Sequence, residues 1–336
     1  MRNETRVLFS AYLDQVARLN GVASAATKFA ATPTVQQTLE TKIQESSAFL
    51  GKINIIGVNE MKGEKVGIGV SGPIASRTDT SGAGKRVPRD VSALSTNDYE
   101  CKQTNYDTYI RYALMDAWAK FPDFQTRIRD VILTRQALDR ICIGFNGTSA
   151  AATTDLGANP LLQDVNIGWL QQYRTNAAAR VMDEVVAASG KVNVGDTGDY
   201  KNLDSLVMDA KSALVDAWYQ EDPRLVCVLG RDLLHDKYFP LVNKDQTGQD
   251  ALATDIIISQ KRVGGLQAVS VPFFPAGTLM VTALDNLSIY WQNGARRRYI
   301  KDAPESDRIE NYESSNDAFV VEDYGRGCVV ENITLV

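Results

Sequence analysis

The sequence of 336 residues contains one histidine and four cysteines. Because most proton relays and many metal sites use histidine, a histidine-dependent catalytic centre would have to rely on His235 alone. This residue lies in the helical-looking stretch GRDLLHDKYFP, where we expect an ordinary, partly buried side chain. The cysteines form neither a C-x-x-C pair for zinc nor a dense disulfide framework. We expect reduced, mostly buried, intracellular thiols at Cys101, Cys142, Cys227 and Cys328.

Long hydrophobic runs and an excess of basic charge are also missing. No stretch approaches the roughly 18 apolar residues that a membrane span requires, and Glu4 and Asp14 interrupt the apolar residues near the start. We therefore expect neither a membrane protein nor an exported one. The net charge of −5 excludes a domain that grips nucleic acid through bulk positive charge. The composition, 44% apolar and 23% charged, is ordinary for a folded soluble protein.

Gly67, Gly69 and Gly72 match the G-x-G-x-x-G spacing of dinucleotide-binding turns. Such a turn needs a strand that ends at the first glycine and a helix that begins near the third. Here valine and isoleucine alternate with the first glycines, as in a strand, and the following residues lack helical periodicity. The nearby GAGK ends at Lys85 and continues with Arg86 instead of the Ser or Thr of a phosphate loop. The sequence therefore predicts no enzyme and no cofactor; a nucleotide-dependent enzyme that uses Gly67 to Gly72 is the remote alternative.

Two alternating segments, residues 65–70 and 97–112, flank a polar tip that is rich in glycine, serine, threonine and arginine. This pattern predicts a long two-stranded arm within residues 60–107. An isolated hairpin is marginal in water because it buries too little apolar surface to offset its chain entropy. We therefore expect the arm to lie on something else, and a neighbouring subunit is the natural candidate.

The clearest helix pattern covers residues 123–143, where Asp123 can cap the start and Gly144 or Gly147 can end the helix. Its apolar stripe consists of Phe124, Ile128, Val131, Ile132, Leu138 and Cys142. The other face carries Arg127, Arg129, Arg135 and Arg140. For these arginines solvation is the default prediction, and contact with another subunit or with enclosed nucleic acid is the alternative. The arginines at 296–298 follow a predicted turn, so a solvated loop is favoured over a phosphate site or a partner for an acidic patch.

The remaining patterns predict helices and strands in about equal measure. Residues 7–19 have the spacing of a short amphipathic helix, and the small residues of 20–35 predict a flexible tether. This helix either packs on the body or detaches to dock elsewhere, and the sequence leaves both possibilities open. A helix over 203–218, the strand LVCVLG and a second helix follow later, and short strands end the chain. The predicted fold class is α+β.

Ten stretches carry a resemblance to a known family: MKGEKVGIGV, YIRYALMDAW, RIRDVILTRQALD, GFNG, NPLLQDVNIGWLQQYR, WYQEDPRLV, DKYFPLVNK, IISQKRVGGL, DRIENYESSN and VVEDYGRGC. In this order the chain resembles the major capsid protein of temperate contractile-tailed phages of the peduovirus type. The resemblance runs from about Met1 to the C-terminus. Blocks such as NPLLQDVNIGWLQ are long and specific.

The resemblance implies the Hong Kong 97-type phage capsid fold. That fold has an N-terminal arm, a long β-hairpin called the E-loop, a P-domain with a spine helix, and an A-domain. The implied boundaries are 1–31 for an N-terminal scaffold-like segment, 32–58 for the N-arm, 59–110 for the E-loop, 111–198 and 302–336 for the P-domain, and 199–301 for the A-domain. The inter-subunit arm would then include Lys65, Gly67, Gly69, Arg77, Lys85 and Arg86.

The resemblance also implies a function in assembly rather than in chemistry. The subunits would form pentamers and hexamers of an icosahedral virion shell around the phage genome, after assembly in the host cytoplasm. The implied partners are a scaffolding protein, a maturation protease, a portal protein and packaged double-stranded DNA in weak non-specific contact; a membrane is not among them. The protease would cut near Phe29, Ala30 and Ala31, and an encapsulin-type compartment of the same fold is the alternative function.

Overall fold

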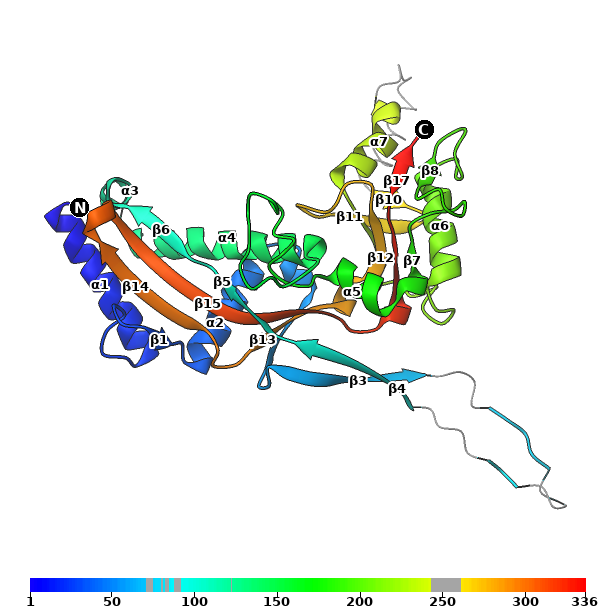
Figure 1. The fold of residues 1–336 in the computed structure, drawn as a ribbon, viewed down its shortest axis with the longest axis horizontal. Helices are drawn as coiled ribbons and strands as arrows, with labels where there is room; N and C mark the ends of the chain where they lie inside the picture. The colour runs from blue at the N-terminus through cyan, green and yellow to red at the C-terminus, as the bar shows by residue number, and fades with distance from the viewer. Residues whose placement is uncertain (71–74, 80, 82–84, 88–91, 122, 243–260) are drawn as a thin grey trace.

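The computed structural model describes residues 1–70, 75–79, 81, 85–87, 92–121, 123–242 and 261–336 (Figure 1). Helices pack on a seven-stranded and a six-stranded sheet, which confirms the predicted α+β class. The two termini lie at opposite ends of the molecule, and a two-stranded hairpin projects away from both sheets.

Strand β15 (Arg308–Val321) is the centre of the seven-stranded sheet. Most of its residues are buried, and buried positions alternate with less buried ones only between Asn311 and Asp317. The sheet order is β1-β14-β15-β13-β2, and β5 and β6 pair with β15 beside this path. These strands are β1 (Phe29–Ala30), β2 (Asn54–Val58), β5 (Lys102–Asn105), β6 (Thr108–Arg111), β13 (Leu287–Gln292) and β14 (Arg297–Ala303).

Helices from the first 176 residues share apolar cores with this sheet. They are α1 (Asn3–Asn20), α2 (Pro33–Glu45), α3 (Tyr112–Trp118), α4 (Phe124–Asn146) and α5 (Trp169–Asn176). Trp169 lies at the centre of the larger core, and its indole Nε1 donates to the Ser288 carbonyl at 3.0 Å. The rings of Phe145 and Phe319 contact it edge-on, with centroids at 5.1 and 5.3 Å. This core fixes α4 and α5 against β13 and β15.

Helix α4 confirms the prediction of a long helix over 123–143, with two details corrected. Asp123 does not cap the helix, because its carboxylate accepts from Arg127 Nε at 2.9 Å instead of from a backbone amide. Val131 is 55% exposed although it was expected in the apolar stripe. Gly147 ends the helix, as predicted.

The six-stranded sheet has the order β10-β11-β9-β12-β16-β7. Its strands are β7 (Val181–Met182), β9 (Leu225–Leu229), β10 (Arg262–Val263), β11 (Leu266–Ser270), β12 (Leu279–Ala283) and β16 (Gly327–Val330). Helices α6 (Leu203–Leu214) and α7 (Arg231–Val242) flank β9 in the chain, which confirms the predicted helix, strand, helix order. Helix α6 is shorter than expected, because it ends before Trp218, which is 59% exposed.

Short elements complete the structure. Strands β8 (Val192–Val194) and β17 (Ile333–Leu335) pair in parallel, and β3 (Lys62–Val70) and β4 (Ser92–Glu100) form the hairpin. The 3-10 turns are η1 (Leu50–Lys52), η2 (Ala178–Arg180), η3 (Leu284–Asn286), η4 (Pro304–Ser306) and η5 (Tyr324–Arg326).

The four cysteines are free and buried, as predicted. Burial raises the pKa of the Cys101 thiol to about 12 and that of Cys142 to about 11, so both are protonated near neutral pH. The expectation for His235 is wrong, because this residue lies on an exposed part of α7. Among the described residues there is no helix with the length and apolarity to cross a membrane.

Candidate assembly site

The hairpin is a nine-residue antiparallel pair that runs from Lys62 opposite Glu100 to Val70 opposite Ser92. Within the described part of the chain, no third strand joins it. Figure 1 shows that it leaves the body beside β13 and extends into open space. The hairpin therefore projects from its own subunit with two strand edges that no other described strand pairs with.

The base of the hairpin is fixed to the seven-stranded sheet by contacts at residues 99–102. The rings of Tyr99 and Tyr290 meet edge-on with centroids 5.1 Å apart, and Cys101 packs with Ala318 and Val320 of β15. Within the hairpin, the Cys101 amide donates to the Met61 carbonyl at 2.8 Å. Hydrogen bonds from lysines 102 and 62 lower the pKa of the Glu100 carboxyl. The arm thus leaves the body from an anchored base.

The glycines of the sequence motif lie inside this hairpin. Gly67 is opposite Ser95 and Gly69 is opposite Ala93 in the ladder, and the next described element after β3 is β4 rather than a helix. The strand prediction is confirmed, and this arrangement differs from a dinucleotide-binding turn, in which a helix follows the strand. Gly72 lies outside the described residues.

Four basic residues of the predicted arm belong to the same projection. Lys65 lies in β3 opposite Asn97. Arg77, Lys85 and Arg86 lie beyond the ends of the paired strands, and all three are exposed. The structure thus gathers the predicted arm residues on one hairpin and leaves its described basic tip residues accessible.

The predicted cut region lies between α1 and α2 and is part of the fold. Phe29 and Ala30 form β1, which pairs with Arg298 and Arg297 of β14. The next amide, that of Ala31, donates to the Arg296 carbonyl at 2.9 Å. The expectation of a flexible tether is therefore wrong here, because β14 offers a free edge on which these residues complete a strand.

Helix α1 packs on the body beside β1 through Phe9, Tyr12 and Val16, which are buried in a core with residues of β14, β15, α3 and α4. Leu19, near the end of the same helix, is 57% exposed. Arg298 Nη2 donates to the Tyr12 hydroxyl at 3.0 Å, which ties the helix to β14. Of the two possibilities left open by the sequence, the structure has the helix packed on the body.

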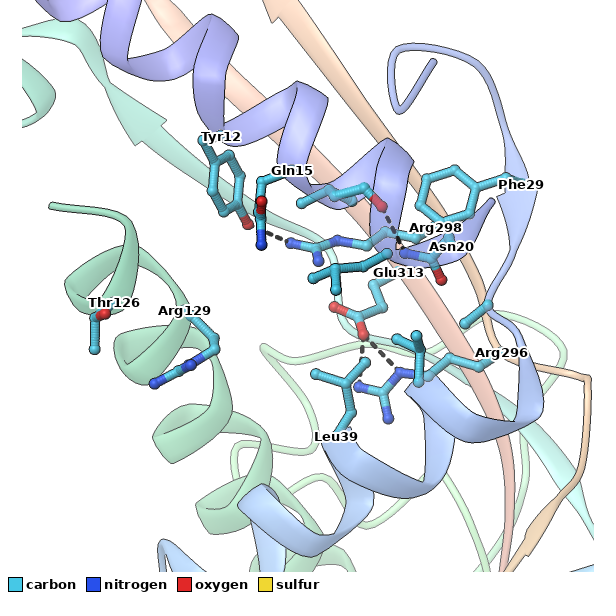
Figure 2. A pocket seen from close by; sticks show the side chains of 14 residues that line it. Tyr12, Gln15, Asn20, Phe29, Leu39, Thr126, Arg129, Arg296, Arg298 and Glu313 are labelled. Atoms are coloured by element: carbon cyan, nitrogen blue, oxygen red, sulfur yellow. Dashed lines mark hydrogen bonds and ion pairs between the residues drawn. The ribbon is translucent and has the colours of Figure 1, made fainter. Parts of the chain in front are cut away.

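A cavity of about 220 Å³ lies under α1, between this helix, α2 and α4 (Figure 2). Its walls combine apolar and charged groups, as shown by Tyr12, Val16, Phe29, Leu39, Arg129 and Glu313. Asn20 lines the same cavity and is 7% exposed; its Nδ2 donates to the Val16 carbonyl, and its Oδ1 has no hydrogen-bond partner within the described residues. The N-terminal segment and the body thus meet across a seam that includes a pocket partly open to solvent.

Below this cavity, six polar side chains form a buried cluster that joins α2, α4 and the seven-stranded sheet. Its members are Glu40, Gln136, Arg140, Arg296, Glu313 and Asp317, each at most 5% exposed. Arg296 Nη1 lies 2.6 Å from Glu40, its Nε lies 2.7 Å from Glu313, and its Nη2 donates to Gln136 Oε1 at 2.9 Å. Arg140 pairs with Glu40 and, at 3.1 Å, with Asp317. We call this set the buried charge cluster.

The charges of this cluster stabilise one another. Burial alone would raise the pKa of Glu313, but Arg296 and Arg298 outweigh burial and lower it to about 2. Burial opposes ionisation of Glu40 in the same way, and Arg140 and Arg296 lower its pKa. Both carboxylates are therefore ionised at neutral pH and hold the arginines in place.

The buried charge cluster corrects two sequence interpretations. Arg140 and Arg296 are 1% exposed, so neither is solvated and neither is available to a phosphate. Arg127, Arg129 and Arg135 are exposed and pair with nearby aspartates, as the default prediction has it. The missed signal is the four-residue spacing of Ile128, Ile132, Gln136 and Arg140, which continues the buried side of α4.

Comparisons with known proteins agree with this geometry. Residues 8–333 match the family model described as "Phage major capsid protein, P2 family". The chain is 55% identical to "Capsid proteins" of Escherichia phage P2, a match that covers 99% of this chain and 95% of that protein. It is 43% identical to the "Major capsid protein" of Serratia phage KSP20, with 99% and 98% covered.

Solved structures give the same result. A chain of the "Satellite phage P4 procapsid including size determination (Sid) protein" superposes with a TM-score of 0.83 at 53% identity, covering 100% of this chain and 99% of that one. A chain of the "Capsid of empty GTA particle computed with C5 symmetry" shares the fold at 12% identity, with a TM-score of 0.51 and 86% and 90% covered.

An α+β subunit with a projecting hairpin, similar over its whole length to capsid chains, defines a viral shell protein of the Hong Kong 97-type fold. The chain belongs to the P2 family of phage major capsid proteins. It is a structural component of the virion, and many copies build the icosahedral shell. The family match favours this function over the encapsulin alternative.

Proposed function

We propose that this chain builds its shell as pentamers and hexamers in which each subunit lays the β3–β4 hairpin across a neighbour. The observation that carries the proposal is the hairpin itself, a two-stranded sheet that projects from the body. Two-stranded hairpins are marginal when solvated on both faces. A neighbour that covers one face would supply the missing burial, so the arm gains stability as the shell forms.

The tip of the hairpin supports an inter-subunit role. Val87 is 78% exposed and lies next to Arg86. Exposed basic residues at Arg77, Lys85 and Arg86 offer charge-assisted contacts to carboxylates of a neighbour. We assign Lys65, Gly67 and Gly69 to the same interface, because glycine leaves one face of a strand open to close packing.

The domain map belongs to the same proposal. Residues 59–110 act as the E-loop, 32–58 as the N-arm, 111–198 and 302–336 as the P-domain with α4 as its spine helix, and 199–301 as the A-domain around the axes of the rings. The A-domain range contains α6, β9 and α7, which share a second apolar core with β8, β16 and β17 of the P-domain range. The P-domain range contains α4 and β15, joined by the buried charge cluster.

Residues 1–31 act as a scaffold-associated segment, and a phage protease removes them near Phe29, Ala30 and Ala31. Assembly takes place in the host cytoplasm with a scaffolding protein and a portal protein. Double-stranded DNA then fills the shell and touches its wall through weak, non-specific contacts. The net charge of −5 supports weak contacts, because a strongly basic wall would hold DNA tightly.

Deleting residues 77–87 tests the arm. The full-length and the deleted chain are each produced together with the scaffolding protein, and particles are counted by sedimentation and negative-stain electron microscopy. We expect regular shells from the full-length chain and few or unstable shells from the deletion. In a second variant, glycine and serine replace the same residues and keep the length of the tip. This variant shows whether assembly depends on the length of the arm or on its side chains. Shells of normal yield and stability from the deletion would contradict the proposal.

A further inference from the structure

The proposed cut region is shielded in this structure. Phe29 is 8% exposed and Ala31 is 6% exposed, and only Ala30 between them is open to solvent. Both β1 residues belong to a ladder with β14. A protease needs an extended stretch of chain free of such pairing, so cleavage of a folded segment proceeds through local opening.

The part of the chain that opens locally is expected to end at α2 on its C-terminal side. Helix α2 begins at Pro33, and the buried Glu40 of this helix is bound by Arg140 of α4 and Arg296 near β14. Opening α2 would remove the carboxylate of Glu40 from two buried arginines, which would leave each of them with one acidic partner instead of two and is costly. Local opening is therefore expected to stop near residue 32, where the anchored helix begins.

The segment itself is held less firmly. Strand β1 has two residues, and the pocket of about 220 Å³ under α1 is partly open to solvent. The Asn20 Oδ1 facing this seam has no partner within the described residues. A two-residue ladder, an underside that is partly open to solvent and an unpaired buried acceptor all lower local stability, so α1 and β1 form a unit that opens before the rest of the fold.

We propose that α1 and β1 form a detachable cover that withholds the cut region until residues 1–31 peel away from β14. The inference rests on the proposed removal of this segment and adds a control step to it. The rate of cleavage is then the fraction of subunits with the cover open multiplied by the rate at which the protease cuts the open chain. A partner that pulls α1 away from the body therefore speeds cleavage, and tighter packing of α1 on the body delays it.

Trypsin measures the opening without any phage enzyme, because Lys28 is exposed and directly precedes Phe29. The purified full-length subunit is digested for increasing times, and mass spectrometry follows the new N-terminus at Phe29. The exposed tip residues Arg77 and Lys85 provide an internal reference in the same chain. We expect the bond after Lys28 to be cut much more slowly than the tip.

Substitutions on α1 change the packing of the cover, and each has a matched control at an exposed position. Val16→Ile adds one methylene at the cavity wall and is expected to slow the cut after Lys28 about fourfold, whereas Val7→Ile on the exposed side of the same helix leaves the rate unchanged. Tyr12→Phe removes the hydrogen bond from Arg298 and is expected to speed the cut about threefold to tenfold. Tyr109→Phe, at an exposed tyrosine, is the control.

A reversible lock gives the decisive comparison. Ala30 and Arg297 are directly opposed in the antiparallel pair of β1 and β14, a geometry that brings Cα atoms to about 4.5–5.5 Å and suits a disulfide. In the variant with Ala30→Cys and Arg297→Cys, oxidation is expected to abolish the cut after Lys28 and reduction to restore it, while the tip cuts stay constant. The proposal of a detachable cover would be overturned if trypsin cut after Lys28 as fast as at the tip, or if oxidation of the disulfide left that rate unchanged. The proposed removal of residues 1–31 fails if subunits of mature particles keep these residues. The trypsin rates would still report whether α1 and β1 open, so the two proposals are tested separately.

Discussion

Arg140 on α4 and Asp317 on β15 form an ion pair at 3.1 Å in which both side chains are 1% exposed. The two residues are 177 positions apart in the chain, and Glu40 of α2 binds the same guanidinium from the other side. A single arginine therefore joins the helix that follows the proposed cut, the long helix and the central strand. Buried pairs of this kind contribute little net stability when intact, but they cost much when one partner is lost.

Replacing Arg140 by methionine is expected to destabilise the subunit by about 3–5 kcal/mol, because the buried carboxylate of Asp317 loses its ion-pair partner and that of Glu40 keeps only Arg296. Denaturant unfolding of the purified subunit measures the change. Arg135→Met on the same helix is the matched control: its ion pair with Asp139 is 62% exposed on the arginine side, so a change below about 1 kcal/mol is expected. Equal effects of the two substitutions would contradict the description of the cluster.

The buried carboxylates predict a loss of stability in acid. The pKa of Glu313 is about 2 in the folded protein, below its ordinary value of 4.5, because Arg296 and Arg298 outweigh burial. Its stabilising contribution is present above pH 4.5 and is lost as the pH falls from 4.5 towards 2. The free energy of unfolding is expected to fall in this window, with a contribution from this group of at most about 1.4 kcal/mol per pH unit.

Glu313→Gln should flatten the acid dependence, and Glu305→Gln serves as its control. The pKa of Glu305 is also lowered, by hydrogen bonds that its carboxylate accepts from its own backbone amide and from Lys301. This carboxylate, however, is exposed to solvent, unlike that of Glu313. Unfolding curves at several pH values from 2 to 7 give the slope for each variant. A slope that Glu313→Gln leaves as steep as in the natural sequence would assign the acid sensitivity to other carboxylates.

The packing of Trp169 predicts a strict requirement for glycine at position 144. A Cβ atom on Gly144 would lie 2.2 Å from the Trp169 ring, so even alanine forces the α4–α5 contact apart. Gly144→Ala is expected to cost about 1–3 kcal/mol, the usual range for overpacking, despite the higher helix propensity of alanine. Gly51→Ala, where the nearest atom is 3.9 Å away, should be close to neutral in thermal melts.

Periodicity predicted those elements whose patterns are local. The spacing of apolar residues places α4 within a few residues of its observed ends, and alternation identifies β3 around Gly67 and Gly69. The order of α6, β9 and α7 is likewise correct. In α4 and α6 one face is buried and the other is exposed, so the spacing along the chain carries the information. Strand β9 is buried at every position, and its uninterrupted apolar run is the signal there.

The parts that were missed depend on partners far away in the sequence. Arg140 and Arg296 look like surface residues locally, and only the fold brings Glu40, Glu313 and Asp317 within reach of them. The segment around Phe29 was expected to be a tether because its residues are small, yet the edge of β14 orders it as β1. Tertiary contacts override local propensity at such places.

Gly69→Val separates a role in assembly from a role in nucleotide binding. The ladder places Gly69 opposite Ala93 in the hairpin, where a bulky side chain obstructs close packing by a neighbour. We expect the variant subunit to fold with an unchanged melting temperature but to give fewer or less stable shells. Val66→Ile, which by strand alternation adds bulk on the opposite face of the same strand, is the matched control and should assemble normally. Binding of NAD or ATP by the natural sequence that Gly69→Val abolishes, with shell yield unchanged, would instead support the nucleotide-dependent alternative.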